Sequence, residues 1–394
     1  MKRAVLIAMI GDLNNGATRG VAEKVIAQAV ALRNIGYEVS GYVGTWGDNT
    51  GVEFPEYVAA IPLGGISAKI NRKRIFLNEV LKRLRQEDVD ILYFRYPLSD
   101  LSVFRFLSRF RTMFPNARVI LERQTKELPE LLTRRTASNL TKYLLEAAFR
   151  VPVQKKTDVN VCVTMEIGRY VEGYYPKAVC ITSGNGISRD LLAEFRERKP
   201  TKDDTIRVVF VGNITPWCGI DWIICELKKK SFSHRGRNVI LTVIGDGVFA
   251  DQLKQETASF EKHVKYLGHQ SGDALKDSIL ENDVAIGSFN NGARRLNEGS
   301  NLKLRLYCAL GIPFVFREMD ADFPPKGGVS RYYLGLNDQS VKPNEFLKSI
   351  LDFAMKMQTE PDAQRQLTAY ANDYLVWERK FERLDKTFQS ILFS

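Results

Sequence analysis

A polar segment that runs directly into an apolar helix carries the clearest chemistry in this chain. Residues 297–316 read Asn-Glu-Gly-Ser-Asn-Leu-Lys-Leu-Arg-Leu-Tyr-Cys-Ala-Leu-Gly-Ile-Pro-Phe-Val-Phe. The pattern predicts a polar turn holding Glu298, a helix that ends at Gly311, and a strand that opens at Pro313. The first backbone amides of such a helix, together with its partial positive charge, favour anions. The segment therefore predicts a phosphate site, to which Lys303 would add a positive side chain.

A second candidate phosphate site lies near the N-terminus, in the loop Gly11-Asp12-Leu13-Asn14-Asn15-Gly16. This loop falls between an apolar strand and a helix, so it also places a helix start where an anion could bind. Its glycines do not have the Gly-x-Gly-x-x-Gly spacing, and a dinucleotide site is therefore not expected. Gly16 is either the glycine of an ordinary strand–helix turn or a phosphate contact, and both interpretations stay open.

Composition favours a two-domain globular protein. The chain has 394 residues, 44% of them apolar and 26% charged, which is too long for one ordinary core. No apolar run approaches the roughly 20 residues that span a bilayer, and the short run at the N-terminus indicates a first strand rather than a signal peptide. Five scattered cysteines and three histidines have no metal-site spacing. We therefore expect reduced thiols, a cytoplasmic location and no metal.

Short apolar runs alternate with helical patterns, and this rhythm predicts parallel, doubly wound α/β sheets. The expected strands of the first half are Val5–Met9, Val39–Val43, Ile91–Phe94, Arg118–Leu121, Asp158–Val163 and Ala178–Ile181. After a Gly- and charge-rich stretch the rhythm starts again, with strands Arg207–Val211, Val239–Ile244, Val264–Leu267, Val284–Ile286 and Pro313–Phe316. We predict two Rossmann-like domains, residues 1–185 and 186–376, with a last helix at 377–394 that packs back on the first domain.

The 297–316 segment resembles the donor-site signature of the GT-B glycosyltransferases, a retaining family that takes sugars from nucleotide diphosphates. In that signature an acid, here Glu298, is followed eight residues later by a second acid. The other positions that fit are Ser300, Leu302, Lys303, Tyr307, Ala309, Gly311 and Pro313. Residues 180–187 resemble the family's interdomain segment, residues 208–221 resemble the start of its C-terminal domain, and 241–247 and 264–269 follow in the expected order.

The resemblance implies two Rossmann-like domains that face each other across a cleft, the first for the acceptor and the second for the donor. It implies metal-independent transfer of a sugar, with retention, to a lipid-linked or saccharide acceptor in cell-surface polysaccharide or glycoconjugate biosynthesis. No cofactor is implied beyond the nucleotide sugar itself. Glu298 would hydrogen-bond the donor sugar, and Glu122, at a strand end, is a second catalytic candidate. The expected donor-binding residues are Gly16, Asn213, Thr215, Gly245, His269, Gly299, Ser300, Asn301, Leu302, Lys303 and Leu306; the acceptor-binding ones are Asn15, Arg95 and Arg123.

Four positions depart from the family pattern, and one of them is Asn301, which stands where the pattern has a proline. The second acid, which grips the nucleotide ribose in the family, is Leu306, and two positions that carry basic residues are Asn213 and Cys218. Two lost charge-assisted hydrogen bonds, each worth about 1.5–3 kcal/mol, would weaken donor binding at least tenfold. The alternative is therefore a catalytically silent relative that acts as a partner or scaffold subunit.

Two acidic pairs imitate the Asp-x-Asp metal motif of the other glycosyltransferase fold. Asp88 and Asp90 precede a strand, which is the wrong end of an α/β sheet for a site. Asp320 and Asp322 fall in a turn before two prolines. We interpret all four as solvated turn acids.

Positive charge is concentrated in the first half of the chain. The net charge is +11, and residues 69–156 carry 20 Lys and Arg against nine Asp and Glu. Two basic amphipathic patterns, Leu101–Phe114 and 131–156, fall in this region. Their apolar stripes either pack on their own domain or bind a membrane peripherally. A nucleic-acid binder is the other class that charge alone suggests, but no recognised motif supports it and we expect none.

Overall fold

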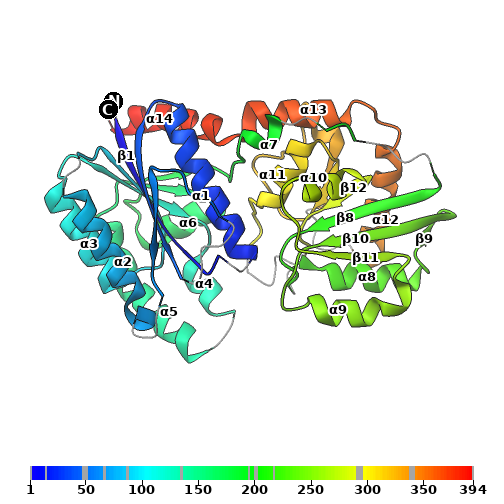
Figure 1. The fold of residues 1–394 in the computed structure, drawn as a ribbon, viewed down its shortest axis with the longest axis horizontal. Coiled ribbons are helices and arrows are strands. Elements are labelled where there is room, and N and C mark those ends of the chain that lie inside the picture. Colours follow the sequence, from blue (N-terminus) through cyan, green and yellow to red (C-terminus); the bar gives the residue numbers. More distant parts are fainter. Residues whose placement is uncertain are drawn as a thin grey trace. The chain divides into compact units, whose positions relative to one another are not determined.

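The computed structural model describes residues 2–13, 16–46, 52–64, 68–85, 88–133, 136–193, 196–198, 203–215, 218–289, 296–336 and 342–392. The chain divides into two compact units. Unit 1 comprises Met1–Gly184 together with Trp377–Ser394, and unit 2 comprises Asn185–Val376. Each unit has its own sheet with helices on both faces (Figure 1).

The described strands of unit 1 form a seven-stranded sheet in the order β3-β2-β1-β4-β5-β6-β7, and each pairing among them is parallel. Residues 4–8 of its central strand are apolar and buried, as expected for a strand covered on both faces. The strands are β1 (Arg3–Gly11), β2 (Glu38–Thr45), β3 (Val58–Pro62), β4 (Ile91–Arg95), β5 (Arg118–Arg123), β6 (Val159–Cys162) and β7 (Cys180–Thr182).

The helices of unit 1 cover this sheet, and the last of them comes from the far end of the chain. That helix, α14, packs against α1, and its Phe381 ring lies 5.6 Å from the ring of Tyr93 in the sheet. The helices are α1 (Gly16–Asn34), α2 (Ala68–Leu84), α3 (Leu101–Met113), α4 (Glu127–Leu131), α5 (Ala137–Gln154), α6 (Met165–Tyr174) and α14 (Trp377–Leu392).

The sheet of unit 2 has the order β11-β10-β8-β12-β13-β14 among its described strands, with parallel pairing throughout this path. The short strand β9 joins β10 in the antiparallel sense. The strands are β8 (Thr205–Val211), β9 (Ser233–His234), β10 (Arg237–Ile244), β11 (Val264–Gly268), β12 (Val284–Ile286), β13 (Phe314–Phe316) and β14 (Tyr333–Gly335).

Two buried clusters hold the helices of unit 2 to the two faces of its sheet. One cluster joins the sheet to α8, α9 and α12, and the other joins it to α10, α11 and α13. The helices are α7 (Asp190–Ala193), α8 (Ile220–Lys229), α9 (Ala250–Thr257), α10 (Gly272–Leu280), α11 (Leu302–Leu310), α12 (Pro343–Met357) and α13 (Ala363–Tyr370).

The predicted fold class is confirmed, since both sheets are parallel and doubly wound. Gly311 ends α11 as expected: it adopts φ +73°, and its amide donates to the Cys308 carbonyl at 3.1 Å. Among the helices that the structure describes, none is both long enough and apolar enough to cross a membrane.

Candidate functional site

The strand order of the unit 2 sheet reverses direction at β8. β8 lies between β10 and β12, so the chain leaves β8 in one direction and later returns on the other side. In open α/β sheets, ligands bind beyond the carboxyl ends of the strands at such a switch point. The residues that follow β8 and β12 are therefore the first place to look for a site in this unit.

Lys303 reaches this switch point from the first turn of α11. Its amine lies 4.0 Å from the ring centroid of Phe210 in β8 and 3.4 Å from Ser288 Oγ, two residues beyond β12. A Cβ atom on Gly212, the first residue after β8, would lie 3.1 Å from Lys303 Nζ. The half-buried ammonium thus stands over the ends of two neighbouring strands, where an anionic group would bind.

The segment that enters α11 is fixed by the residues that follow β13. The Gly299 amide donates to the Met319 carbonyl at 2.8 Å, and the Met319 amide donates to Asn297 at 3.0 Å. Glu298 lies between these two bonds and is half-buried. Asn301 is the N-cap residue of α11, and no side-chain cap is described there. The predicted phosphate-facing turn is therefore held as a short extension of the sheet.

Glu318, which no sequence argument singled out, lies beneath this turn. Its side chain is buried and accepts a hydrogen bond from Asn301 Nδ2. A Cβ atom on Gly299 would lie only 2.6 Å from Glu318 Cγ, so glycine is what lets the turn pass so close. Burial raises the pKa of Glu318 to about 7. Its position two residues after the apolar run Phe314–Phe316, at a strand's carboxyl end, is the sequence signal that could have marked it.

Close backbone contact joins the loop after β8 to the loop after β10. Gly212 donates its amide to the Ile244 carbonyl at 2.9 Å, and Ile214 donates to Asp246 at 2.8 Å. Gly245 has φ +128°, and a Cβ atom there would lie 2.2 Å from the Gly212 carbonyl oxygen. Only glycine satisfies both the conformation and the close approach, so Gly245 shapes the site through its backbone.

Thr215, a predicted donor contact, and Cys218, which departs from the family pattern, contact each other inside the loop that follows β8. Both are buried, and Thr215 Oγ1 lies 3.3 Å from Cys218 Sγ. The Cys218 thiol also donates to the Asn213 carbonyl at 3.0 Å. Cys218 therefore closes the loop in place of the basic residue expected there. Asn213 and His269 are exposed, each within two residues of a strand end on this edge.

Arg305 is a second buried charge that sequence reasoning missed. Its guanidinium is fully buried; it donates to both carboxyl oxygens of Asp320, one at 2.7 Å, and to Asp322. The prediction that Asp320 and Asp322 are solvated turn acids is wrong, because they neutralise this arginine. Arg305 also donates to the Asn185 carbonyl at 3.0 Å. An arginine between two apolar neighbours, Leu304 and Leu306, was the available signal.

Ser300 anchors the same corner of unit 2. Its side-chain oxygen accepts a hydrogen bond from the Asn185 amide at 2.7 Å, and its carbonyl accepts one from Asn185 Nδ2 at 2.5 Å. Since Ser300 is buried in these contacts, its role at the start of α11 is to position the turn.

Leu306 shares a face of α11 with Leu302 and Lys303. All three are half-buried, whereas the remaining residues of the helix are buried. Leu306 packs against the cluster that joins α11 to the sheet, so it presents an apolar surface where the family pattern has an acid. The ribose contact expected of an acid cannot come from this side chain.

Unit 1 has its own switch point, between β1 and β4, and Arg95 ends β4 there. Arg95 Nη1 lies 3.5 Å from Glu122 Oε2 and makes no hydrogen bond to the residues that the structure describes. Gly16, the predicted contact next to this point, begins α1, while Asn15 lies outside the described residues. Arg95 Nη1 is thus buried against Glu122, and the half-buried side chain at the end of β4 is the remaining acceptor candidate of unit 1 among the described residues.

Glu122 is enclosed behind Arg95. It accepts hydrogen bonds from Gln28 at 2.6 Å and Tyr93 at 3.2 Å and pairs with Lys24 at 3.1 Å. Burial alone would raise the pKa of Glu122, but Lys24 and Arg95 hold it below its ordinary value. Burial also lowers the pKa of Lys24 to about 8. Glu122 is therefore buried as a counter-ion to Lys24 and Arg95, which does not fit the predicted catalytic role.

Arg123 also differs from the expectation of an acceptor contact. Its side chain is fully buried and donates to Asn160, Glu127 and Gln154, at 3.2, 3.1 and 3.1 Å. The Tyr96 ring centroid lies 3.4 Å from the guanidinium carbon. Every nitrogen of the guanidinium thus donates a hydrogen bond inside unit 1. The structure therefore does not favour the predicted contact between Arg123 and an acceptor.

Comparison with solved structures identifies the fold. The chain is similar to HepE of Anabaena, solved with UDP, at a TM-score of 0.63 and 13% identity, covering 99% of this chain and 100% of that one. It is similar to WaaG, a glycosyltransferase involved in lipopolysaccharide biosynthesis, at 0.66 and 13%, covering 97% and 98%. Sucrose-phosphate synthase of Thermosynechococcus elongatus gives 0.66 and 12%, covering 100% and 99%.

No protein-family model matches the chain, and no curated protein matches it in sequence. The solved structures nevertheless span nearly the whole of this chain and of their own. The chain therefore has the GT-B fold, and the predicted resemblance to the GT-B glycosyltransferases is confirmed at the level of the fold.

Proposed function

We propose that this protein is a glycosyltransferase that takes a sugar from a nucleotide diphosphate sugar bound to unit 2. The observation that carries the proposal is the amine of Lys303 at the β8–β12 switch point, beside the start of α11. A diphosphate there would meet the ammonium and the amide end of the helix together. HepE, which shares the fold, has been solved with UDP and with UDP-glucose.

The transfer breaks the bond between the anomeric carbon and the diphosphate oxygen, and the electron pair leaves with the diphosphate. The acceptor hydroxyl oxygen forms the new bond to that carbon, and its proton passes to the departing diphosphate oxygen. Charge therefore grows on the leaving oxygens, where Lys303 and the α11 amides would stabilise it without a metal. Glu298 is proposed to hydrogen-bond the sugar hydroxyls from the turn held by Met319, and the transfer is proposed to retain the anomeric configuration.

Unit 1 is proposed to hold the acceptor, a saccharide or a lipid-linked sugar of cell-surface polysaccharide or glycoconjugate biosynthesis. Arg95 would contact a phosphate of such an acceptor from the unit 1 switch point. A lipid-linked acceptor would place the protein at the cytoplasmic face of a membrane, and residues 69–156 are the proposed membrane contact because of their basic charge.

A second candidate function follows from Leu306, Asn213 and Cys218. Leu306 packs on the core, and Cys218 closes a loop, so neither supplies the charge that the family pattern has there. A catalytically silent relative that serves as a partner or scaffold subunit would retain the GT-B fold without needing these groups.

Thermal unfolding with a panel of nucleotide sugars, followed by a turnover assay, separates the two functions. A ligand that binds only the native state raises the melting temperature. The proposal predicts stabilisation by at least one nucleotide sugar, and turnover that falls strongly in Glu298→Gln. The control is Glu281→Gln, which removes an exposed carboxylate of unit 2 beyond α10. No stabilisation by any member of the panel would favour the scaffold.

A further inference from the structure

Helix α5 of unit 1 buries polar side chains and exposes leucines. An amphipathic helix of a globular domain ordinarily turns its apolar stripe toward the core. The buried side chains of α5 are Glu146, Val153 and Gln154, and two of these three are polar. Its leucines are instead exposed: Leu140 at 57%, Leu144 at 60% and Leu145 at 40%.

The buried network described above explains the inner face. Gln154 accepts a hydrogen bond from Arg123, and Glu146 accepts one from Tyr96 at 2.7 Å and another from the Ser99 amide. A guanidinium buried beside the sheet needs polar partners, and α5 supplies them. Glu146 and Gln154, eight residues apart on the inner side of α5, are therefore polar, whereas Leu140, Leu144 and Leu145 are exposed.

The outer face of α5, defined by Leu140, Leu144, Leu145 and Ala148, is an exposed apolar strip. Leu140, Leu144 and Ala148 follow one another at intervals of four residues, and Leu145 lies three residues before Ala148. Side chains at these spacings are neighbours on a helix surface. Leu101, at the start of α3, is also exposed and follows closely on Ser99, which contacts Glu146 in the middle of α5. Exposed apolar surfaces of this kind are typical of sites that bind a membrane or another protein.

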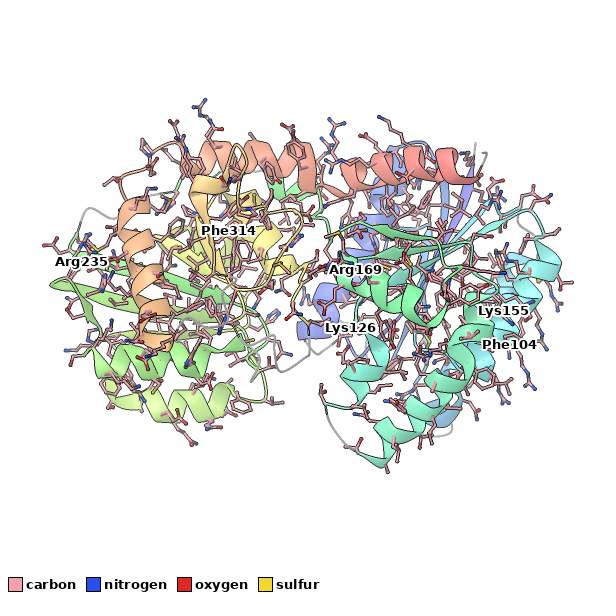
Figure 2. The ribbon with its side chains drawn as sticks, turned by 180° about the vertical axis from the view of Figure 1, so that it is seen from behind. Phe104, Lys126, Lys155, Arg169, Arg235 and Phe314 are labelled. Carbon is pink, nitrogen blue, oxygen red and sulfur yellow. The ribbon has the colours of Figure 1, made fainter. Side chains whose placement is uncertain are left out.

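Its neighbour α3 shows that exposure is not a general property of the basic region. The stripe of α3 includes Leu107 and Phe110, which are buried in the core of unit 1. Phe104 is half-buried and its ring centroid lies 6.4 Å from that of Phe149 in α5. Figure 2 labels Phe104 and Lys155 in the part of unit 1 where these helices meet. Of the two predicted amphipathic patterns, one packs inward and the other leaves its apolar side exposed.

The charges near the apolar strip of α5 indicate what kind of surface would cover it. Glu146 is the only acid in α5 and is buried, so the helix presents no carboxylate outward. Lys142, on α5, and Lys155, just beyond its C-terminus, are exposed, and Arg105 and Arg109 are exposed on α3. We propose that the outer face of α5 docks unit 1 on an anionic lipid bilayer, with leucines entering the interface and lysines meeting the headgroups. The inference rests on the proposed membrane contact and not on the transfer chemistry.

The test is sedimentation of the full chain with phosphatidylcholine vesicles, with and without phosphatidylglycerol, in the absence of nucleotide sugar. The Leu140→Glu/Leu144→Glu variant is expected to bind the anionic vesicles at least about tenfold more weakly than the native chain. Val248→Glu/Leu267→Glu is the matched control, since it places the same charges at two exposed apolar positions of unit 2. The control is expected to bind like the native chain, and neutral vesicles are expected to bind weakly.

A second pair of variants leaves the leucines in place. Lys142→Ala/Lys155→Ala is expected to weaken binding to anionic vesicles roughly 25-fold, from about fivefold for each lysine. Lys262→Ala/Lys265→Ala, which removes two exposed lysines of unit 2, is expected to have no such effect. Melting temperatures of all variants show whether each one is folded.

Three results would overturn the inference. One is no binding of the native chain to anionic vesicles, and another is equal loss of binding in the α5 variants and their unit 2 controls. The third is a lipid-independent dimer that the α5 variants abolish, because a second copy of the chain would then be the occupant. Thermal stabilisation by nucleotide sugars is measured separately, so failure of the membrane inference leaves the proposed donor site untouched.

Discussion

Replacing Lys303 with methionine tests the candidate donor site at the residue on which it depends most. Methionine keeps the length and apolar body of the side chain, so contact with Phe210 is preserved while the charge is lost. An anionic oxygen about 4 Å from the ammonium would interact by about 4 kcal/mol at an effective dielectric constant near 20. Because Lys303 is half-buried, solvent screening lowers this to about 1.5–3 kcal/mol, the value of a hydrogen bond to a charged group.

The expected result is a 10- to 150-fold rise, roughly, in the dissociation constant for a nucleoside diphosphate. Calorimetric titration of the native chain and Lys303→Met with uridine and guanosine diphosphates measures it. Lys254→Met is the control, since Lys254 lies on α9 of the same unit with only an ion pair of 3.8 Å to Asp251. Binding of Lys303→Met within twofold of the native chain would refute the placement of the diphosphate beside Lys303.

The other predictions concern the residues around this point. Leu306→Glu should tighten nucleoside diphosphate binding about tenfold in calorimetry if the new carboxylate reaches the ribose, and unchanged affinity would mean that another group holds the ribose. Gly245→Ala should lower the free energy of unfolding by about 1–3 kcal/mol in urea, because its Cβ would lie 2.2 Å from a carbonyl oxygen. Gly236→Ala, at φ +77° with nothing within 4 Å, should cost clearly less, and equal losses would exclude the steric explanation. Burial raises the pKa of the Glu318 carboxyl from 4.5 to about 7. Between these pH values the native state keeps the carboxyl proton and the unfolded state loses it. The free energy of unfolding should therefore fall, by up to about 3 kcal/mol, as pH rises from about 4.5 to about 7. Glu318→Gln should remove that part of the decline in urea unfolding at pH 5 and pH 8, and an unchanged decline would contradict the raised pKa.

The sheets and the turn before α11 could be predicted from the sequence because their signals are local. Apolar runs of strand length alternate with helical patterns, and Gly311 and Pro313 mark where α11 ends and β13 begins. The conformation of Gly311 and the strand Phe314–Phe316 agree with that prediction. The resemblance of ordered motifs then led to the GT-B fold.

The buried charges could not be predicted, because their partners are distant in the sequence. Arg305 is neutralised by Asp320, fifteen residues away, and Arg123 donates hydrogen bonds to Gln154 and Asn160, 31 and 37 residues away. Composition and periodicity state only that these residues are charged, and charged residues are mostly exposed. The same limit explains α5: its period predicts an amphipathic helix, but only Arg123 and its partners decide which face turns inward.

The most direct test of the proposed donor site is a crystal structure of the complex with the nucleoside diphosphate that stabilises the protein best. The proposal predicts diphosphate oxygens within hydrogen-bond distance of Lys303 Nζ and of the first backbone amides of α11, over the ends of β8 and β12. A diphosphate bound elsewhere, such as beside Arg95 in unit 1, would contradict the assignment of the donor site to unit 2.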